Sequence, residues 1–103
     1  MYEIKFSKRF LKDIDNLQFD FNLSKQEIRM AKNEIFDAVD MLAENGTLPA
    51  EYFDHELKER PWVGFNEFHV FSDLLVVYFR IDAKQRIRMV RIRNHSNLRQ
   101  GEE

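Results

Sequence analysis

The feature that most constrains the fold is a set of three extended runs in the second half of the chain. They span residues 62–71, 74–81 and 86–93, and short turn segments at 72–73 and 82–84 separate them. Apolar runs of this length, rich in β-branched and aromatic residues and bounded by turn residues, are typical of strands. Connections this short join antiparallel neighbours, so the pattern predicts a three-stranded meander.

A long amphipathic helix is predicted before the meander. Ser24 and Glu27 have the spacing of a capping box at its start, and Asn45-Gly46 supplies a left-handed stop at its end. Between these signals the apolar residues recur at helical spacing and form one continuous stripe. They are Ile28, Ala31, Ile35, Ala38, Val39 and Leu42.

The N-terminal region predicts a short strand and a short helix. Tyr2, Ile4 and Phe6 alternate with charged residues, as in a strand with one buried face. Ser7 is the expected cap of the helix that follows. The apolar positions of that helix are Phe10, Leu11, Ile14 and Leu17, and the positions expected to face water are Lys8, Lys12, Asp13 and Asp15.

Two segments have no strong pattern. Residues 18–23 are expected to be a linker, and residues 49–58 a loop that carries His55 to an edge or face of the sheet. The expected fold class is therefore α+β, in the order β-α-α-β-β-β, with two helices packed on one face of a small antiparallel sheet. A chain of 103 residues supports a single domain over residues 1–103.

Composition excludes several classes of protein. The chain has no apolar run near eighteen residues and no signal-peptide pattern, so we expect a cytoplasmic protein without a membrane partner. It has no cysteine, which excludes disulfides and thiolate chemistry.

Charge is distributed unevenly along the chain. Residues 1–59 carry eight Lys/Arg against thirteen Asp/Glu, and residues 60–103 carry eight against five. Six basic residues and no acidic residue lie between Lys84 and Arg99. Such a segment attracts anions, phosphate above all, although charges on an edge strand also serve simply to keep it soluble.

Side-chain alternation predicts which residues face away from the helices. If Phe68 and Val70 are buried, Glu67 and His69 point to the opposite, open face of the sheet. Phe65 also has the parity of His69, so a half-buried histidine with satisfied hydrogen bonds is an alternative.

The last strand needs a bulge to bury its apolar residues together. One near Met89-Val90 would place all four in the core, namely Ile87, Met89, Val90 and Ile92. Arg91 and Arg93 would then face away from the core.

Four motifs occur in order between residues 54 and 98. They read D-H-x-L, W-x-G-[FY], E-x-H-V-x-x-D-x-L-[LIV]-x-Y and V-R-x-x-x-H-S-x-L. Together they closely resemble the YafQ branch of the RelE/ParE superfamily, bacterial type II toxins that cleave messenger RNA on the ribosome. The resemblance implies a RelE-like fold, which agrees with the predicted element order.

What the resemblance implies is metal-independent ribonuclease chemistry without a cofactor. An RNA 2′-hydroxyl attacks the adjacent phosphate, which requires a proton acceptor, a proton donor and positive charge on the transition state. Histidine suits both proton roles near neutral pH. The motif match places the catalytic set on His55, His69, Asp73 and His95, and the substrate-binding set on Glu67, Arg91, Arg93 and Arg99.

The resemblance also implies roles within these sets. His69 or His55 would act as base and His95 as acid, while Asp73 orients a histidine and Arg91 stabilises the phosphate. Arg60 and Arg93 are the candidates to replace an arginine that the family often carries at the position of Asn66. Arg99 stands where the family has phenylalanine and would stack on a base through its guanidinium plane.

Each of these residues also has a purely structural interpretation. His55 can cap its loop, His95 and Asp73 can be turn residues, and Glu67 can be an ordinary strand residue. Trp62, Phe65 and Tyr78 are interpreted as packing residues, although an exposed aromatic ring can stack on a base.

The partners implied by the resemblance are the ribosome, messenger RNA and a cognate antitoxin. Such antitoxins usually carry a ribbon-helix-helix domain of the DinJ or RelB type, so operator DNA would be contacted only through the antitoxin. We expect acidic antitoxin residues to cover the basic segment from Lys84 to Arg99.

Two other functions compete with this interpretation. A metal hydrolase would use His55, His69, Asp73 and His95 as ligands, but H-x-H and H-x-x-x-H spacings are absent. A non-catalytic toxin similar to ParE, which inhibits a topoisomerase, would share the fold but generally lacks the histidine set.

Overall fold

The computed structural model describes residues 1–21, 23–71 and 73–94. In this part of the chain the helices are α1 (Lys8–Asp15), α2 (Leu17–Asp20) and α3 (Lys25–Asn45), and the strands are β1 (Glu3–Phe6), β2 (His55–Glu56), β3 (Asn66–Val70), β4 (Leu74–Ile81) and β5 (Arg86–Arg93). Short 3₁₀ turns lie at Ala50–Tyr52 and Asp82–Lys84. The α+β class and the predicted order of the main elements are confirmed.

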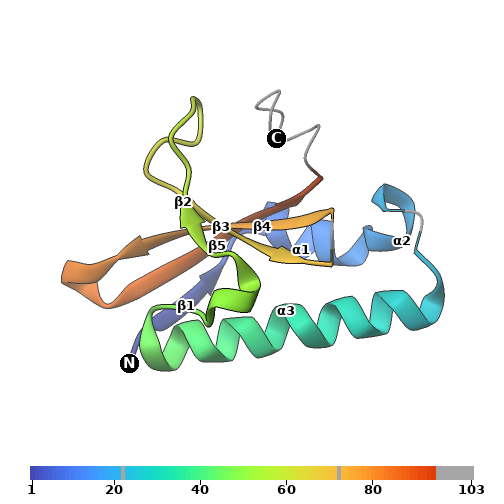
Figure 1. Ribbon diagram of the computed structural model, residues 1–103, viewed down its shortest axis with the longest axis horizontal. Coiled ribbons are helices and arrows are strands. Elements are labelled where there is room, and N and C mark those ends of the chain that lie inside the picture. The colour runs from blue at the N-terminus through green and yellow to red at the C-terminus, as the bar shows by residue number, and fades with distance from the viewer. Residues whose placement is uncertain (22, 72, 95–103) are drawn as a thin grey trace.

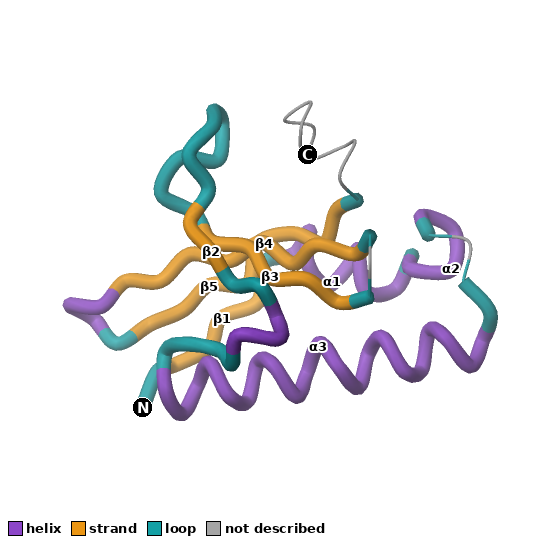
Figure 2. Tube along the Cα trace, in the orientation of Figure 1, coloured by secondary structure: helices purple, strands orange, loops and turns teal. Residues whose placement is uncertain are grey.

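The five strands form one sheet in the order β1-β5-β4-β3-β2 (Figures 1 and 2). β3, β4 and β5 are the antiparallel meander that the sequence predicts. β1, however, pairs in parallel with β5, so the sheet is mixed and the expectation of a purely antiparallel sheet is wrong. Parallel neighbours need a long crossover, which α1, α2, α3 and the rest of the intervening chain supply.

α3 covers one face of the sheet, whereas the long loop between β2 and β3 rises from the opposite side (Figure 2). The predicted stripe of α3 packs into a core with residues of the meander. Ala31, Ile35, Ala38 and Leu42 are fully buried, as are Phe68, Val76, Tyr78, Ile87 and Met89 on the sheet. This packing leaves the other face open for a functional site.

The predicted caps of α3 are confirmed. Ser24 Oγ accepts a hydrogen bond from the Glu27 amide at 3.1 Å, and Glu27 Oε1 accepts one from the Ser24 amide at 2.9 Å. These bonds lower the pKa of Glu27 below its usual value. Gly46 ends the helix with φ 75°, and a Cβ there would clash with the ring of Tyr2. Glycine is therefore required for two reasons.

α1 begins at Ser7 as predicted, because Ser7 Oγ accepts from the Phe10 amide at 3.0 Å. Its outward face was predicted wrongly at two positions. Leu11 is 48% exposed, and Asp13 is only 7% exposed. The reason is that β1 pairs no further than Met89, so α1 lies beside the rest of β5 and turns Asp13 toward that strand edge.

Asp13 takes the place of a neighbouring strand. Its Oδ2 accepts a hydrogen bond from the Ile92 amide at 2.8 Å, which is the backbone bond that a longer β1 would have made. The same carboxylate accepts from Arg91 Nε at 2.8 Å and from Arg91 Nη2 at 3.3 Å. Helix, strand edge and arginine are thus joined at one buried group.

Three loop expectations also differ from the structure. The predicted linker contains α2, and His55 lies in the short strand β2 rather than in a loop. Trp62 to Phe65 form a turn instead of the start of a strand, with the Phe65 amide bonded to Trp62 O at 3.0 Å and Gly64 at φ 88°. Positive φ at Gly64 reverses the chain before β3 begins.

The bulge in β5 is confirmed. Val77 pairs with Arg91 and Tyr78 with Met89, so Val90 is the extra residue. Ile87, Met89 and Ile92 are buried as expected, but Val90 is only half-buried, because the bulged residue has no direct partner in the ladder. Among the described residues, no helix has both the length and the apolarity to cross a bilayer.

Replacing Asp13 with alanine should destabilise the fold strongly. The change leaves the Arg91 charge and the Ile92 amide buried without their acceptor, which costs about 3–5 kcal/mol of unfolding free energy. Urea denaturation monitored by circular dichroism measures the loss.

The matched control is Asp15→Ala on the same helix. Asp15 is exposed, so its removal should change the unfolding free energy by no more than about 0.5 kcal/mol. Equal stability of the two variants would mean that Asp13 does not hold α1 to β5.

Candidate functional site

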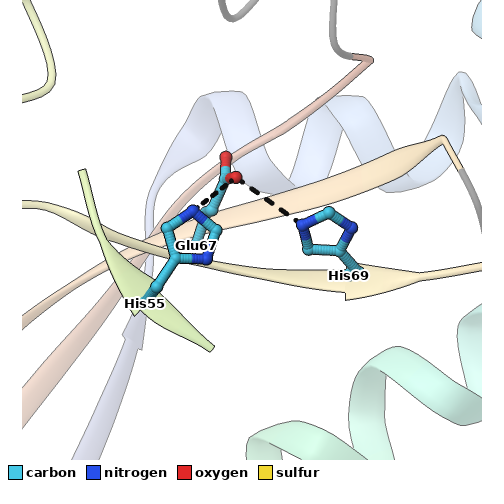
Figure 3. Close-up of side chains that lie close together, drawn as sticks. All are labelled: His55, Glu67 and His69. Carbon is cyan, nitrogen blue, oxygen red and sulfur yellow. Dashed lines mark ion pairs between the residues drawn. The ribbon is translucent and has the colours of Figure 1, made fainter. Parts of the chain in front are cut away.

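Three predicted site residues, His55, Glu67 and His69, meet on the open face of the sheet (Figure 3). His55 comes from β2, and Glu67 and His69 come from β3. Because side chains alternate along a strand, residues 67 and 69 share one face, while Phe68 points into the core. The predicted parity of β3 is confirmed.

Pairing of β2 with β3 brings His55 to this face. His55 lies directly opposite Glu67 in the antiparallel ladder. Its Nε2 lies 3.0 Å from Glu67 Oε1, and Nε2 of His69 lies 3.7 Å from the same oxygen. Glu67 therefore stands between two imidazoles whose centroids are 6.0 Å apart.

The three side chains differ in their contact with solvent. The side chain of Glu67 is 6% exposed, that of His69 is 23% exposed and that of His55 is 48% exposed. A buried carboxylate thus lies beneath two more accessible imidazoles. The accessible rings are the ones that a substrate would meet first.

Phe53 fixes both histidines. Its carbonyl oxygen lies 2.7 Å from His55 Nδ1, and its ring meets the His69 ring edge-on with centroids 5.8 Å apart. Phe53 has φ 52°, a left-handed conformation that phenylalanine rarely adopts. The turn that this residue makes after the first 3₁₀ segment directs the chain into β2.

Two arginines share the open face, two strands away from the cluster. Glu67 pairs with Val77 and Val77 with Arg91, and in the next row His69 pairs with Leu75 and Leu75 with Arg93. The sequence correctly places both guanidinium groups on the side away from the core. They are not exposed, however, because Arg91 is 5% and Arg93 6% accessible.

Arg91 is held by Asp13 through its Nε and Nη2 atoms. Its remaining nitrogen, Nη1, is buried and has no hydrogen-bond partner within the described residues. Buried guanidinium groups are usually satisfied completely. Nη1 is thus a candidate donor to an anion.

Asp73 lies apart from the cluster. It is an exposed residue of the β3–β4 turn and lines a separate cleft of about 230 Å³ with Phe21, Leu23 and Phe71. The structure therefore does not bring Asp73 together with His55, Glu67 and His69. His95 and Arg99 fall outside the described residues.

An apolar cleft of about 320 Å³ lies on the same side of the sheet as the cluster, and its lining includes Arg91 but none of the three cluster residues. Phe65 and Phe79 line it, with ring centroids 5.1 Å apart, and Arg9, Arg88 and Arg91 surround it. Neither aromatic ring is fully buried. The cleft thus combines a flat apolar surface with guanidinium groups.

Sequence reasoning missed two residues that shape this site, Asp13 and Phe53. Asp13 had a detectable signal, because it lies three residues after Phe10 and four before Leu17 and so shares their buried helical face. Phe53 had none, because its role depends on a backbone conformation that local sequence does not encode.

The cluster also has the composition of a metal site. One donor atom from each of His55, Glu67 and His69 lies within 4.8 Å of the others. Two imidazole nitrogens and a carboxylate oxygen are suitable ligands for Zn²⁺ or Cu²⁺. This set differs from the ligands expected for a metal hydrolase, since Asp73 is not part of it.

Comparisons with known proteins agree on one family. A crystal structure of a YafQ variant from Escherichia coli superimposes with a TM-score of 0.73 at 26% identity, covering 95% of this chain and 98% of that one. YafQ in the E. coli DinJ–YafQ complex gives 0.71 at 27% identity, covering 95% and 98%. A metal-bound toxin from Helicobacter pylori gives 0.71 at 30% identity, covering 95% and 99%.

No curated protein sequence matches the chain. The family model described as "Bacterial toxin of type II toxin-antitoxin system, YafQ" matches residues 2–100, almost the entire chain. The chain therefore belongs to the YafQ family of bacterial type II toxins.

Proposed function

We propose that this protein is a ribosome-dependent messenger RNA endoribonuclease that acts without a metal. The observation that carries the proposal is the cluster of His55, Glu67 and His69 on the open face, on the same side of the sheet as a cleft surrounded by arginines. The RNA 2′-hydroxyl attacks the adjacent phosphorus, and the 5′-oxygen leaves with a proton. Catalysis then needs a base, an acid and cationic groups near the phosphate.

The contacts of the two ring nitrogens of His55 limit what this histidine can do in proton transfer. The Phe53 carbonyl only accepts, so His55 Nδ1 must carry a proton. Its other nitrogen, Nε2, faces the Glu67 carboxylate at 3.0 Å. Both ring nitrogens of His55 are thus already in contact with protein groups, which makes this ring less available than His69 to accept a proton from the substrate.

His69 is consequently the better base. Its Nε2 is 3.7 Å from Glu67 Oε1, beyond hydrogen-bond distance but near enough for the carboxylate to stabilise a protonated ring. The Glu67 carboxylate can then interact electrostatically with both histidines. We retain His95 as the acid that protonates the 5′-oxygen, with Asp73 orienting a histidine, because the motif match assigns these roles.

Arg91 and Arg93 are proposed to stabilise the phosphate. Asp13 holds Arg91 rigidly, and the Nη1 atom of Arg91 keeps its donors for a phosphate oxygen. Arg93 lies in the same row of the sheet as His69. Arg99 remains a candidate for base stacking.

The apolar cleft supports binding of RNA over binding of a small polar substrate. Every nucleobase has a flat apolar face, and stacking on an aromatic ring contributes about 1–3 kcal/mol per base. Phe65 and Phe79 provide such rings, and Arg88 and Arg9 supply positive charge for neighbouring phosphates. This fits a single-stranded messenger RNA presented on the ribosome in the cytoplasm.

A cognate antitoxin is the second proposed partner. E. coli YafQ has been solved with DinJ, and we infer a corresponding ribbon-helix-helix antitoxin for this chain, through which alone the toxin would contact operator DNA. Lys84 and Arg88 are exposed on the basic segment, which suits acidic antitoxin residues. Arg91 is too deeply buried to contribute to that surface.

Alanine at His69 or His55 should reduce cleavage about 10²- to 10⁴-fold, the usual contribution of a general acid or base. Cleavage of messenger RNA on purified ribosomes, mapped by primer extension, measures the change. Growth arrest on expression should weaken in parallel, and His95→Ala should behave in the same way.

Glu56→Gln is the control, because Glu56 is the exposed neighbour of His55 on β2 and has no assigned role. It should cleave as the wild type does. Intact messenger RNA together with DNA-damage signalling would instead identify a topoisomerase inhibitor of the ParE type.

The contacts of the His55 ring should be visible in its ¹⁵N NMR spectrum. In the wild type, Nδ1 should have the chemical shift of a protonated nitrogen, because it donates to the Phe53 carbonyl. Glu67→Gln should shift the Nε2 resonance and leave Nδ1 in place, because the side-chain amide that replaces the carboxylate can donate to Nε2.

Glu56→Gln serves again as the control and should leave the ring spectrum unchanged. An Nε2 resonance that is the same in the wild type and in Glu67→Gln would mean that Glu67 does not engage this nitrogen, and would make His55 the better base.

Metal binding is a second candidate function, favoured by the three donor atoms within 4.8 Å and by the metal-bound H. pylori relative. A bound ion would occupy the same imidazole nitrogens that the reaction needs. Zinc should therefore inhibit cleavage, and chelation should restore it. His55→Ala should weaken zinc binding at least about tenfold in calorimetric titrations, because one of three ligands is lost.

Asp73→Ala should leave zinc affinity unchanged, since Asp73 is outside the cluster. Loss of cleavage on treatment with a chelator alone would contradict the metal-independent mechanism and favour a metal hydrolase.

A further inference from the structure

One strong hydrogen bond lies on the face of the sheet opposite the candidate site. The Tyr78 hydroxyl is 2.7 Å from both carboxylate oxygens of Asp54, so its single proton is shared between them. Tyr78 is completely buried in the core formed with α3. Asp54 immediately precedes His55 in the chain.

The hydrogen bond between Tyr78 and Asp54 passes across β3 on the side of the sheet that faces the core. Tyr78 on β4 and Glu56 on β2 both pair with Asn66 of β3. Tyr78 must therefore pass under β3 to reach the chain that enters β2. It ties the edge of the sheet to the second strand inward.

β2 needs such an anchor. It has only two residues, His55 and Glu56, and a ladder of two pairs is too short to hold an edge strand by itself. Phe53, two residues before β2 begins, has a left-handed backbone conformation that phenylalanine rarely adopts. A fixed contact at Asp54 keeps the chain from leaving the sheet at this point.

We propose that Tyr78 and Asp54 act together as a positioning latch that holds His55 against Glu67. The inference rests on the proposed function, because the position of His55 matters for activity only if His55 takes part in the reaction. Asp54 and His55 are consecutive and point to opposite faces, so the latch contacts the core while His55 contacts the substrate side. Neither Tyr78 nor Asp54 touches the reacting groups.

The chemistry of the pair suits a permanent anchor. Burial, together with the neighbouring Asp54 carboxylate, raises the pKa of Tyr78 well above its usual value. Because the folded-state pKa is raised, the Tyr78 hydroxyl keeps its proton up to its ordinary pKa of about 10 and loses it only in stronger alkali. The latch therefore stays closed across the range in which histidines titrate.

The test compares Tyr78→Phe and Asp54→Ala with two matched variants. Tyr78→Phe removes only the hydroxyl, and Asp54→Asn keeps an oxygen that can accept from it. Tyr2→Phe is the control, because the Tyr2 hydroxyl also bonds to a carboxylate, Asp82 Oδ1 at 3.0 Å, but at an exposed position in a different part of the sheet.

The primary readout is the ¹⁵N NMR spectrum of the His55 ring, which needs no nuclease activity. We expect Tyr78→Phe and Asp54→Ala to lose the wild-type ring pattern as Nδ1 leaves Phe53 O and Nε2 leaves Glu67. Asp54→Asn and Tyr2→Phe should retain it. In the double variant Tyr78→Phe/Asp54→Ala, the effect should equal that of either change alone.

The second readout is cleavage at saturating substrate. Tyr78→Phe should lower kcat about 10- to 100-fold with little change in KM, since a displaced catalytic group loses orientation and not binding. The pH–rate profile should change in parallel with the His55 spectrum, and Asp54→Asn should recover most of the activity.

A wild-type His55 spectrum in Tyr78→Phe and in Asp54→Ala would overturn the latch. If Tyr78→Phe fails to fold, the decision passes to Asp54→Ala against Asp54→Asn, where Asp54 is only half-buried. A changed His55 spectrum without any RNA cleavage in the wild type would support the latch and refute the nuclease.

Discussion

The packing of α3 against one face of the sheet is the constraint on which the rest of the structure depends. It buries the apolar stripe of the helix on Phe68, Val76 and Met89 and removes that face from solvent. Once this side is filled, alternation along each strand forces the intervening side chains to the other face. The polar residues gathered there are consequences of the core as much as of local preference.

At both sides of the sheet, side chains make contacts that longer outer strands would otherwise make. Beyond the end of β1, Asp13 of α1 satisfies the free edge of β5 and holds Arg91. At the opposite edge, Asp54 joins the short β2 to Tyr78 in the core. In each case a carboxylate that accepts hydrogen bonds from a distant residue fixes the backbone that carries a functional residue. A small domain thereby gains precise positions for Arg91 and His55 without longer strands.

The open face combines groups that differ in accessibility and charge. Glu67 is buried between two imidazoles, and two guanidinium groups lie two strands away in the same rows. Fixed charges in a partly desolvated site interact more strongly than they would in water. The proposed division of labour between His55 and His69 follows from what each ring nitrogen already contacts. From residue type alone, either histidine could have been assigned the role of base.

The amino-acid sequence by itself determined the elements whose signals are local. The capping box at Ser24, the stop at Gly46, the stripe of α3, the meander and the bulge at Val90 were all predictable, because short-range periodicity and turn chemistry specify them. It also determined that Glu67 and His69 share a face, and its motifs identified the YafQ family. Tertiary structure alone decided that β1 runs parallel to β5, that Asp13 bonds to Arg91 and to the Ile92 amide, and that β2 forms next to β3. Those features depend on contacts between residues as many as 83 positions apart, such as Glu3 with Arg86, and no local pattern records which distant partner completes a strand edge.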